Sequence, residues 1–113
     1  MKKQKVYIAS PYTIGDQALN VREQILTGRK LMKLGFCPYM PELHHFVHLL
    51  CPLEYDEIMD LDLQWLDSCD CVLRLPGESK GADIEVKYAL DNNKNVFYSM
   101  IELIDYYESS RTF

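Results

Sequence analysis

Four short runs of apolar, β-branched and aromatic residues are spaced along the chain, and each is typical of a buried strand. They cover Lys5–Ser10, Phe36–Met40, Cys71–Leu75 and Lys94–Tyr98. Apolar residues at helical spacing fill Asp16–Leu34, Leu53–Ser68, Ser79–Asn92 and Met100–Ser109. Strand–helix–strand units of this length require parallel crossovers. The order predicts a single α/β domain over residues 1–113, with a doubly wound, mainly parallel Rossmann/flavodoxin-like sheet of about four to five strands flanked by helices.

The first helix carries clear start and stop signals. Asp16 is a plausible N-cap, and Gly35 is a standard stop after the last apolar position. Gly28 inside the apolar stripe indicates close approach of another element. The expected apolar face consists of Val21, Ile25, Gly28 and Met32, widened by Leu19, Leu26 and Leu31.

Two carboxylates fall on apolar helix faces. Asp62 lies in the middle of the stripe of its helix, and Glu85 lies between Ala82 and Ala89, at the edge of the apolar side. An ionised carboxylate in such a place is costly unless it is paired or has a task. For Asp62, capping of a neighbouring loop is the structural alternative.

The stretch Leu75–Glu85 predicts an anion site. Breaking residues follow a strand and open a helix, whose first N–H groups have no partner within the helix. Ser79 is a candidate N-cap, Lys80 adds a positive charge, and Gly77 and Gly81 give the turn. Glu85, close to this helix start, is expected to stay ionised.

The irregular segment from Glu42 to Pro52 holds all three histidines. His44 and His48 are four residues apart, a spacing that permits a metal site. No further ligand motif completes it, so a short amphipathic helix or lid over the sheet is favoured, with His44 as a contact to a ligand's base.

Composition narrows the class of partner. The net charge is −5 and apolar residues make up 48% of the chain, so a nucleic-acid polymer is not expected as a partner. No run reaches membrane-spanning length, and no hydrophobic leader follows the N-terminal lysines. The four cysteines, Cys37, Cys51, Cys69 and Cys71, do not form a secreted disulfide framework. A cytoplasmic protein with reduced thiols is expected.

The carboxyl ends of parallel strands share one edge of a sheet. This edge would bring together Ala9–Tyr12, the segment after Pro41 and the loop Gly77–Glu85, with Asp62 entering from its helix. Two carboxylates, an anion loop and aromatic rims suit a glycosyl-type reaction on a small phosphorylated substrate.

The same residues carry a resemblance to a known superfamily. Val6–Tyr12, Asp62–Leu66 followed by Cys69–Val72, and Ser79–Glu85 followed by Ala89 resemble the nucleoside 2-deoxyribosyltransferases. The likeness covers most of the chain and extends to the nucleoside 5'-monophosphate N-glycosidase branch. The chain is especially similar to the small phage and bacterial members of this superfamily, which have no assigned activity.

The resemblance implies roles for individual residues. Glu85 matches the nucleophile that attacks C1' of the sugar, and Asp62 matches the acid that assists protonation of the leaving base. Ser79 matches the position that holds a 5'-phosphate in the monophosphate hydrolases. The residues expected to bind substrate are Tyr7, Ala9, Ser10, Tyr12, Gly77, Ser79, Lys80, Gly81 and His44.

The resemblance also implies a homodimer and no metal or organic cofactor. The C-terminal residues Tyr106, Tyr107, Ser109, Ser110 and Arg111 are candidates to complete a neighbouring subunit's site. The first loop departs from the pattern, because Ala9–Tyr12 stands where the monophosphate hydrolases usually supply a glycine and an arginine. Phosphate affinity would then rest on Ser10, Ser79, Lys80 and backbone N–H groups.

Two other classes of function stay open. A nucleotide-binding or sensing module on the same fold would keep the glycine and serine loop without needing Glu85. A structural or interaction domain would bind no nucleotide, and removal of Asp62 from its apolar stripe would stabilise it.

Overall fold

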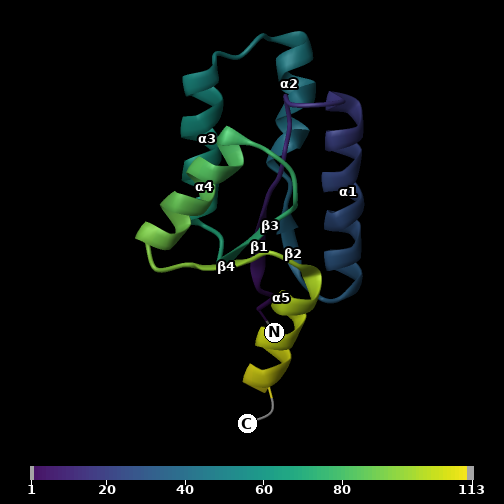
Figure 1. The fold of residues 1–113 in the computed structure, drawn as a ribbon, viewed down its shortest axis with the longest axis vertical. Helices are drawn as coiled ribbons and strands as arrows, with labels where there is room; N and C mark the ends of the chain where they lie inside the picture. The colour runs from purple at the N-terminus through teal and green to yellow at the C-terminus, as the bar shows by residue number, and fades with distance from the viewer. Residues whose placement is uncertain (1, 112–113) are drawn as a thin grey trace.

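The computed structural model describes residues 2–111, with side chains described as far as Glu108. Strands and helices alternate along the chain (Figure 1). The strands are β1 (Lys5–Ala9), β2 (Cys37–Tyr39), β3 (Cys71–Arg74) and β4 (Asn95–Phe97). The helices are α1 (Gln17–Lys33), α2 (His44–Leu50), α3 (Tyr55–Asp67), α4 (Lys80–Asp91) and α5 (Met100–Arg111), with a short 3₁₀ turn η1 (Pro41–Leu43) before α2.

The strands form one parallel sheet in the order β2-β1-β3-β4. β1 is central, with Val6 opposite Pro38 on one side and Cys71 on the other. The predicted α/β fold with a parallel Rossmann/flavodoxin-like sheet is therefore confirmed, with four strands in the described part of the chain.

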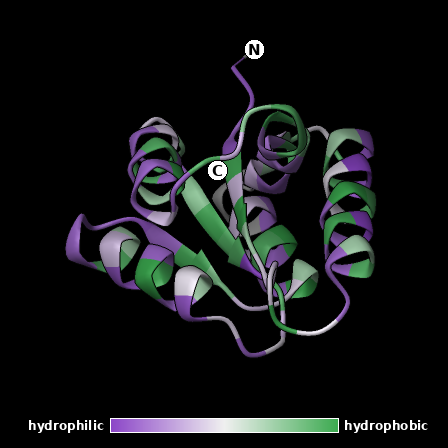
Figure 2. Ribbon diagram, turned by 90° about the horizontal axis from the view of Figure 1, so that it is seen from above, coloured by the Kyte–Doolittle hydropathy of each residue, from purple (hydrophilic) through white to green (hydrophobic). Residues whose placement is uncertain are grey.

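Alternate residues of β1 build two core layers on opposite faces of the sheet. Val6 and Ile8 pack with Leu31 of α1 and Leu103 of α5. Tyr7 and Ala9 pack on the other face, with residues of α3 and α4 that include Leu66, Ala82 and Ala89. In Figure 2 the largely apolar strands run between helices on both sides. Within residues 2–111, no helix is long and apolar enough to span a bilayer.

The ends of α1 follow the sequence signals. The Asp16 side chain accepts a hydrogen bond from the Leu19 N–H at 3.1 Å, and Gly35 adopts a φ of 92° after the helix. A Cβ on Gly28 would lie 2.3 Å from Met40 Sδ, which confirms the predicted close approach.

The predicted apolar face of α1 is partly wrong. Val21, Gly28 and Leu31 are buried as expected, but the fourth buried residue is Gln24. Ile25, Met32, Leu19 and Leu26 are exposed. The buried stripe is narrower than the apolar pattern indicates, and Gln24 is buried in it because its amide has polar partners inside the protein.

Some C-terminal side chains pack within their own chain. The Tyr107 ring lies 5.7 Å from Phe36 and 6.1 Å from Phe97, and Tyr106 lies 5.3 Å from Phe97. The side chains of Ser109, Ser110 and Arg111 lie outside the described residues.

Candidate functional site

Glu85 lies on the sheet-facing side of α4 and is only 5% exposed. The Tyr7 hydroxyl, from β1 below it, donates a hydrogen bond of 2.5 Å to Glu85 Oε2. This contact joins two residues 78 positions apart and holds the carboxyl group over the carboxyl end of β1. The hydroxyl donor stabilises the ionised form of Glu85.

Asp62 enters the same region from α3 and is 7% exposed. His44 Nδ1 lies 3.2 Å from Asp62 Oδ1, and His44 Nε2 lies 2.8 Å from the Tyr39 hydroxyl. Burial lowers the pKa of His44, which favours the neutral imidazole. Asp62 thus lies at the end of a hydrogen-bonded chain from Tyr39 through His44.

The two carboxyl groups influence each other directly. Burial raises the pKa of Asp62, and burial together with the charge of Asp62 and a hydrogen bond with it raises the pKa of Glu85. The Tyr7 hydrogen bond opposes the rise at Glu85 without cancelling it. Because two neighbouring carboxylates repel each other, Glu85 and Asp62 as a pair bind one proton more tightly than an isolated carboxyl group would.

The expectation that Glu85 stays ionised because it lies near the start of its helix is therefore wrong, since the pKa of Glu85 is raised in this structure. Glu85 lies beyond the first turn of α4, which begins at Lys80. The favourable field of a helix N-terminus fades within that first turn, so burial and the neighbouring acid decide the pKa.

A third buried acid, Glu42 in η1, was missed by the sequence analysis. It is 8% exposed and accepts hydrogen bonds from Ser10 Oγ at 2.6 Å and from Gln24 Nε2 at 3.0 Å. The Gln24 Oε1 accepts from the Glu42 backbone N–H at 2.7 Å. Ser10, a predicted substrate contact, is thus engaged with two polar groups of its own chain.

The loop after β3 has the expected architecture. Ser79 is the N-cap of α4, and its hydroxyl accepts a hydrogen bond from the Ala82 N–H at 3.1 Å. The N–H groups of Lys80 and Gly81 have no acceptor within the helix, so they and the Ser79 hydroxyl are candidate donors to a ligand. Lys80 is exposed, and Gly81 is half-buried beside Met59.

Gly77 joins this loop to the loop after β1. Its φ is 119°, and a Cβ there would lie 2.7 Å from Pro11 Cγ. Arg74 supports the turn: it donates to the Leu75 and Gly77 carbonyl oxygens and lies 3.1 Å from Asp83 Oδ1. A glycine is required here both by the backbone conformation and by the approach of Pro11.

Aromatic rings border the acids on the β2 side. Tyr39 stacks on Tyr7 at 5.8 Å and on Trp65 at 5.2 Å, and Trp65 is 47% exposed. The Tyr12 hydroxyl lies 2.5 Å from His45 Nδ1. Because Tyr39 is stacked between Tyr7 and Trp65, the exposed ring of Trp65 is the one of these three that can stack on a planar ligand.

The histidine segment forms a short helix, α2, as predicted, and this helix lies beyond the carboxyl ends of the strands (Figure 1). None of its residues is buried, and its three histidines make polar contacts to different elements. His48 Nδ1 accepts a hydrogen bond from the Leu53 N–H at 2.8 Å instead of facing His44. Across residues 2–108, no three His, Cys, Asp or Glu side chains are grouped to hold a metal ion.

The four cysteines are free thiols. Cys69 and Cys71 are buried near the amino end of β3, where burial raises the pKa of each thiol to about 11. Thiols with raised pKa values are poor nucleophiles, which fits a packing role.

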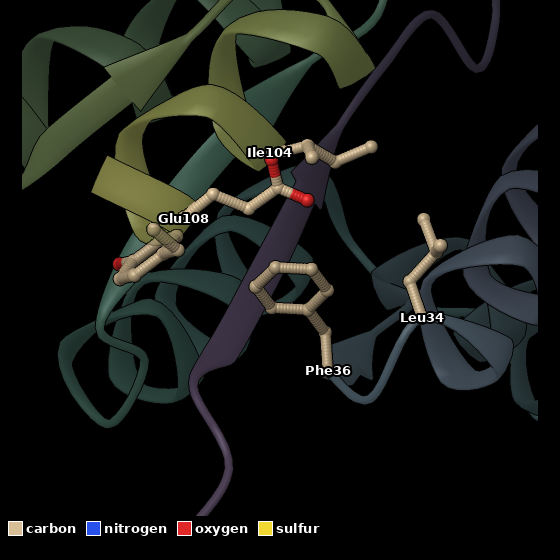
Figure 3. Close-up of a pocket in the computed structure, with 5 residues that line it drawn as sticks. Leu34, Phe36, Ile104 and Glu108 are labelled. Carbon is tan, nitrogen blue, oxygen red and sulfur yellow. The ribbon is translucent and has the colours of Figure 1, made fainter. Parts of the chain in front are cut away.

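A small hollow of about 50 Å³ lies at the opposite, amino edge of the sheet. It is lined by Leu34 and Phe36 on one side and by Ile104, Tyr107 and Glu108 of α5 on the other (Figure 3). Ligand pockets usually have volumes of about 300–1,000 Å³. The hollow is too small for a nucleotide.

Residues 4–98 match a protein family described as a domain of unknown function, DUF4406. The chain belongs to this family. The DUF4406 region contains β1 to β4, both central carboxylates and the loop at Gly77–Ser79, and it ends before α5. A comparison with curated proteins finds no match.

The structure brings together most of the predicted site. Tyr7, Glu85, Asp62 and His44 form one connected cluster, and Ser10 and Tyr12 lie beside it. Gly77, Ser79, Lys80 and Gly81 form the adjoining loop and helix start, and Ala9 ends β1 between them. The sequence analysis missed Glu42, Gln24, Tyr39 and Arg74.

Proposed function

We propose that this DUF4406 protein is an N-glycosidase that cleaves the base–sugar bond of a nucleoside or deoxynucleoside 5'-monophosphate, or a closely related deoxyribosyltransferase. The observation that carries the proposal is the buried pair Glu85 and Asp62, with the Tyr7 hydroxyl bound to Glu85. Further support comes from the resemblance of the motifs around both carboxylates to the nucleoside 2-deoxyribosyltransferases.

The pair supplies two complementary roles from one shared proton. Glu85, as carboxylate, attacks C1' of the sugar, and the bond between C1' and the base nitrogen breaks. Asp62, as acid, gives its proton to the departing base. Burial raises the pKa of both acids, and the hydrogen bond between them raises the pKa of Glu85 and lowers that of Asp62. One acid can therefore be ionised while the other is protonated, and the reaction requires the shared proton to move from Glu85 to Asp62.

The second half of the reaction releases the sugar from Glu85. Water attacks C1' of the glycosyl ester, its proton passes to the ionised Asp62, and Glu85 leaves as a carboxylate. A second base in place of water gives the transferase reaction. His44, bound to Asp62 and Tyr39, keeps Asp62 oriented through both steps.

The start of α4 is the proposed site of the phosphate. Ser79 and the first N–H groups of α4 are donors, and Lys80 contributes a positive charge nearby. Arg74 stabilises the loop through backbone carbonyls, so it shapes the phosphate site without being free to bind the phosphate itself.

Access to the acids requires movement of a covering element. Glu42, Asp62 and Glu85 are each less than 10% exposed. Helix α2 lies over this edge at the end of the molecule opposite α5 (Figure 1) and has no buried residue of its own. We propose that α2 acts as the lid, with its histidine contacts broken and remade as substrate binds.

A nucleotide-binding module is the second candidate. The raised pKa of Glu85 favours it, since a protonated carboxyl is not a nucleophile. In this alternative, the loop at Ser79 and the exposed ring of Trp65 would bind the ligand without chemistry. The homodimer and the cytoplasmic location stay predictions.

The test is a panel of ribo- and deoxyribonucleosides and their 5'-monophosphates, with chromatography for free base. Wild type is compared with Glu85→Gln and with Glu23→Gln, an exposed glutamate on α1, as the matched control. Base release from a monophosphate, lost only in Glu85→Gln, supports the N-glycosidase. Release that requires a second base indicates a transferase, and nucleotide binding without release favours the binding module.

A further inference from the structure

One oxygen of the Glu42 carboxyl group has no hydrogen-bond partner. Glu42 is 8% exposed, and its Oε1 is the single buried side-chain nitrogen or oxygen without a partner in the part of the chain that the structure describes. Buried polar atoms are nearly always hydrogen-bonded, and an exception requires a reason.

The rest of this carboxyl group is fully engaged. Oε2 accepts from Ser10 Oγ at 2.6 Å and from Gln24 Nε2 at 3.0 Å. The Gln24 amide also binds the Glu42 backbone, which fixes the side chain from both ends. Both lone pairs of Oε2 are occupied, so the proton of the neutral acid has its place on Oε1. Oε1 is thus an unused hydrogen-bond donor on a rigid support.

The order of the strands places this donor relative to the proposed substrate. Glu42 follows β2, and Ser79 follows β3, on opposite sides of the central β1. A nucleotide with its phosphate at Ser79 and its C1' at Glu85 would extend its base past β1 towards β2. There it would meet the half-exposed ring of Trp65, which stacks on Tyr39 with one face and can stack on a planar base with the other.

We propose that Glu42 is a specificity-determining residue, whose neutral carboxyl group donates a hydrogen bond from Oε1 to a carbonyl oxygen or unprotonated ring nitrogen of the substrate's base. The inference rests on the proposed function, because it requires a ligand that carries a base. It adds a recognition role for a residue outside the catalytic pair.

The electrostatic surroundings keep Glu42 neutral. Burial raises the pKa of Glu42 to about 8, and the charge of Asp62 adds to the rise, while the Ser10 hydrogen bond opposes it. The titratable groups around it are Asp62 of α3, Glu85 of α4, Tyr12 of the first loop, and the histidines that begin α2. Burial and the charge of Asp62 therefore favour a neutral Glu42 at pH 7.

The experiment measures binding by calorimetry in a Glu85→Gln background, so that the probe is not cleaved. The probes are the four common deoxynucleoside 5'-monophosphates, and deoxyribose 5-phosphate serves as the control without a base. Glu42→Leu removes the donor, and Glu42→Gln keeps one at every pH through its amide N–H groups.

At pH 7, we expect Glu42→Leu to bind the best monophosphate about tenfold more weakly and deoxyribose 5-phosphate unchanged. Glu42→Gln should stay within about twofold of the Glu42 protein. Between pH 7 and 9, the Glu42 protein should lose about tenfold in affinity relative to Glu42→Gln, because about a tenth of Glu42 is neutral at pH 9.

A second readout does not depend on a Glu42 variant. The ¹³C shift of the Glu42 carboxyl, titrated with and without a saturating monophosphate, should show a higher pKa in the complex. Equal monophosphate affinity in all three Glu42 proteins, with an unchanged carboxyl titration, would mean that Oε1 binds only water, and would overturn the inference while leaving the proposed function intact. If no monophosphate binds, both fail.

Discussion

The two edges of the sheet have opposite chemistry. At the carboxyl edge, the buried side chains include Tyr7, Glu42, Asp62 and Glu85, and His44 of α2 contacts Asp62. At the amino edge, a small hollow is lined by Leu34 and Phe36 on one side and by Ile104, Tyr107 and Glu108 of α5 on the other, so that Glu108 is the one acid of a mainly apolar lining (Figure 3). β1 runs from one edge to the other.

This difference between the edges indicates that the amino edge contributes mainly to stability and the carboxyl edge to function. Apolar packing at the amino edge is favourable by itself, whereas three buried acids are costly, and their raised pKa values express that cost. Sites where a sequence violates the rules of stable packing are commonly functional. Substitutions at the two edges should therefore have opposite effects on activity and on stability.

The largest effect is expected from Asp62→Asn. It removes the acid that protonates the leaving base, so base release should fall about 10³-fold at pH 7. The melting temperature should hold or rise, because a neutral amide replaces a buried acid. Initial rates of base release and a thermal melt check both parts. A lower melting temperature with unchanged base release would reverse the proposed roles of the two edges.

Phe36→Ala should show the opposite behaviour at the amino edge. Phe36 is 6% exposed and packs edge-on against Tyr107. Its truncation should lower the free energy of unfolding by about 3 kcal/mol. Base release at saturating substrate should stay within about twofold, since Phe36 lies at the other end of the sheet from Glu85. Denaturant titration and rate assays test this. Loss of activity in a folded variant would argue against separate edges.

Tyr7→Phe tests the support of the proposed nucleophile. Without the hydroxyl donor, the ionised form of Glu85 loses stabilisation, so the pKa of Glu85 should rise further and base release should fall about 10- to 100-fold. The pH at which activity reaches half its maximum should move upward. A profile that keeps its midpoint would show that the hydrogen bond does not act on Glu85.

The smallest effect concerns stability against pH. The folded-state pKa of Glu42, about 8, lies above the ordinary value of 4.5, so its contribution is fully present below that ordinary value and is lost as pH rises through about 8. Between pH 7 and 9, wild type should lose about 1.4 kcal/mol more free energy of unfolding than Glu42→Gln does. Parallel denaturation curves at the two pH values measure it. Equal losses would show that Glu42 is not held neutral.

The strands, the helices and the two central carboxylates could be predicted from the sequence, because the patterns that indicate them are local. Strand runs and helix caps such as Asp16 and Ser79 depend on neighbouring residues alone, and they gave the strands and helices. Asp62 and Glu85 stood out because a carboxylate on an apolar stripe is costly. The same reasoning failed for Gln24, a polar residue that takes an inward position on α1.

The burial of Glu42 and the raised pKa of Glu85 could not be predicted, because they depend on contacts between segments that are distant in sequence. Glu42 lies in an irregular stretch, and its burial arises only when β1, α1 and η1 meet. The approach of Asp62 raises the pKa of Glu85, which no feature of α4 alone indicates. Tertiary contacts of this kind override a local reading of helix position or polarity.

The central claim is that Glu85 forms a covalent bond to the sugar, and trapping that bond tests it most directly. A 2'-fluorinated nucleoside 5'-monophosphate slows hydrolysis of a glycosyl ester, because the fluorine disfavours positive charge at C1'. Mass spectrometry of the whole protein and of its peptides should find one added sugar phosphate on the peptide that contains Glu85, with none in Glu85→Gln. Stoichiometric base release or saturating binding of the probe without any adduct would contradict the account.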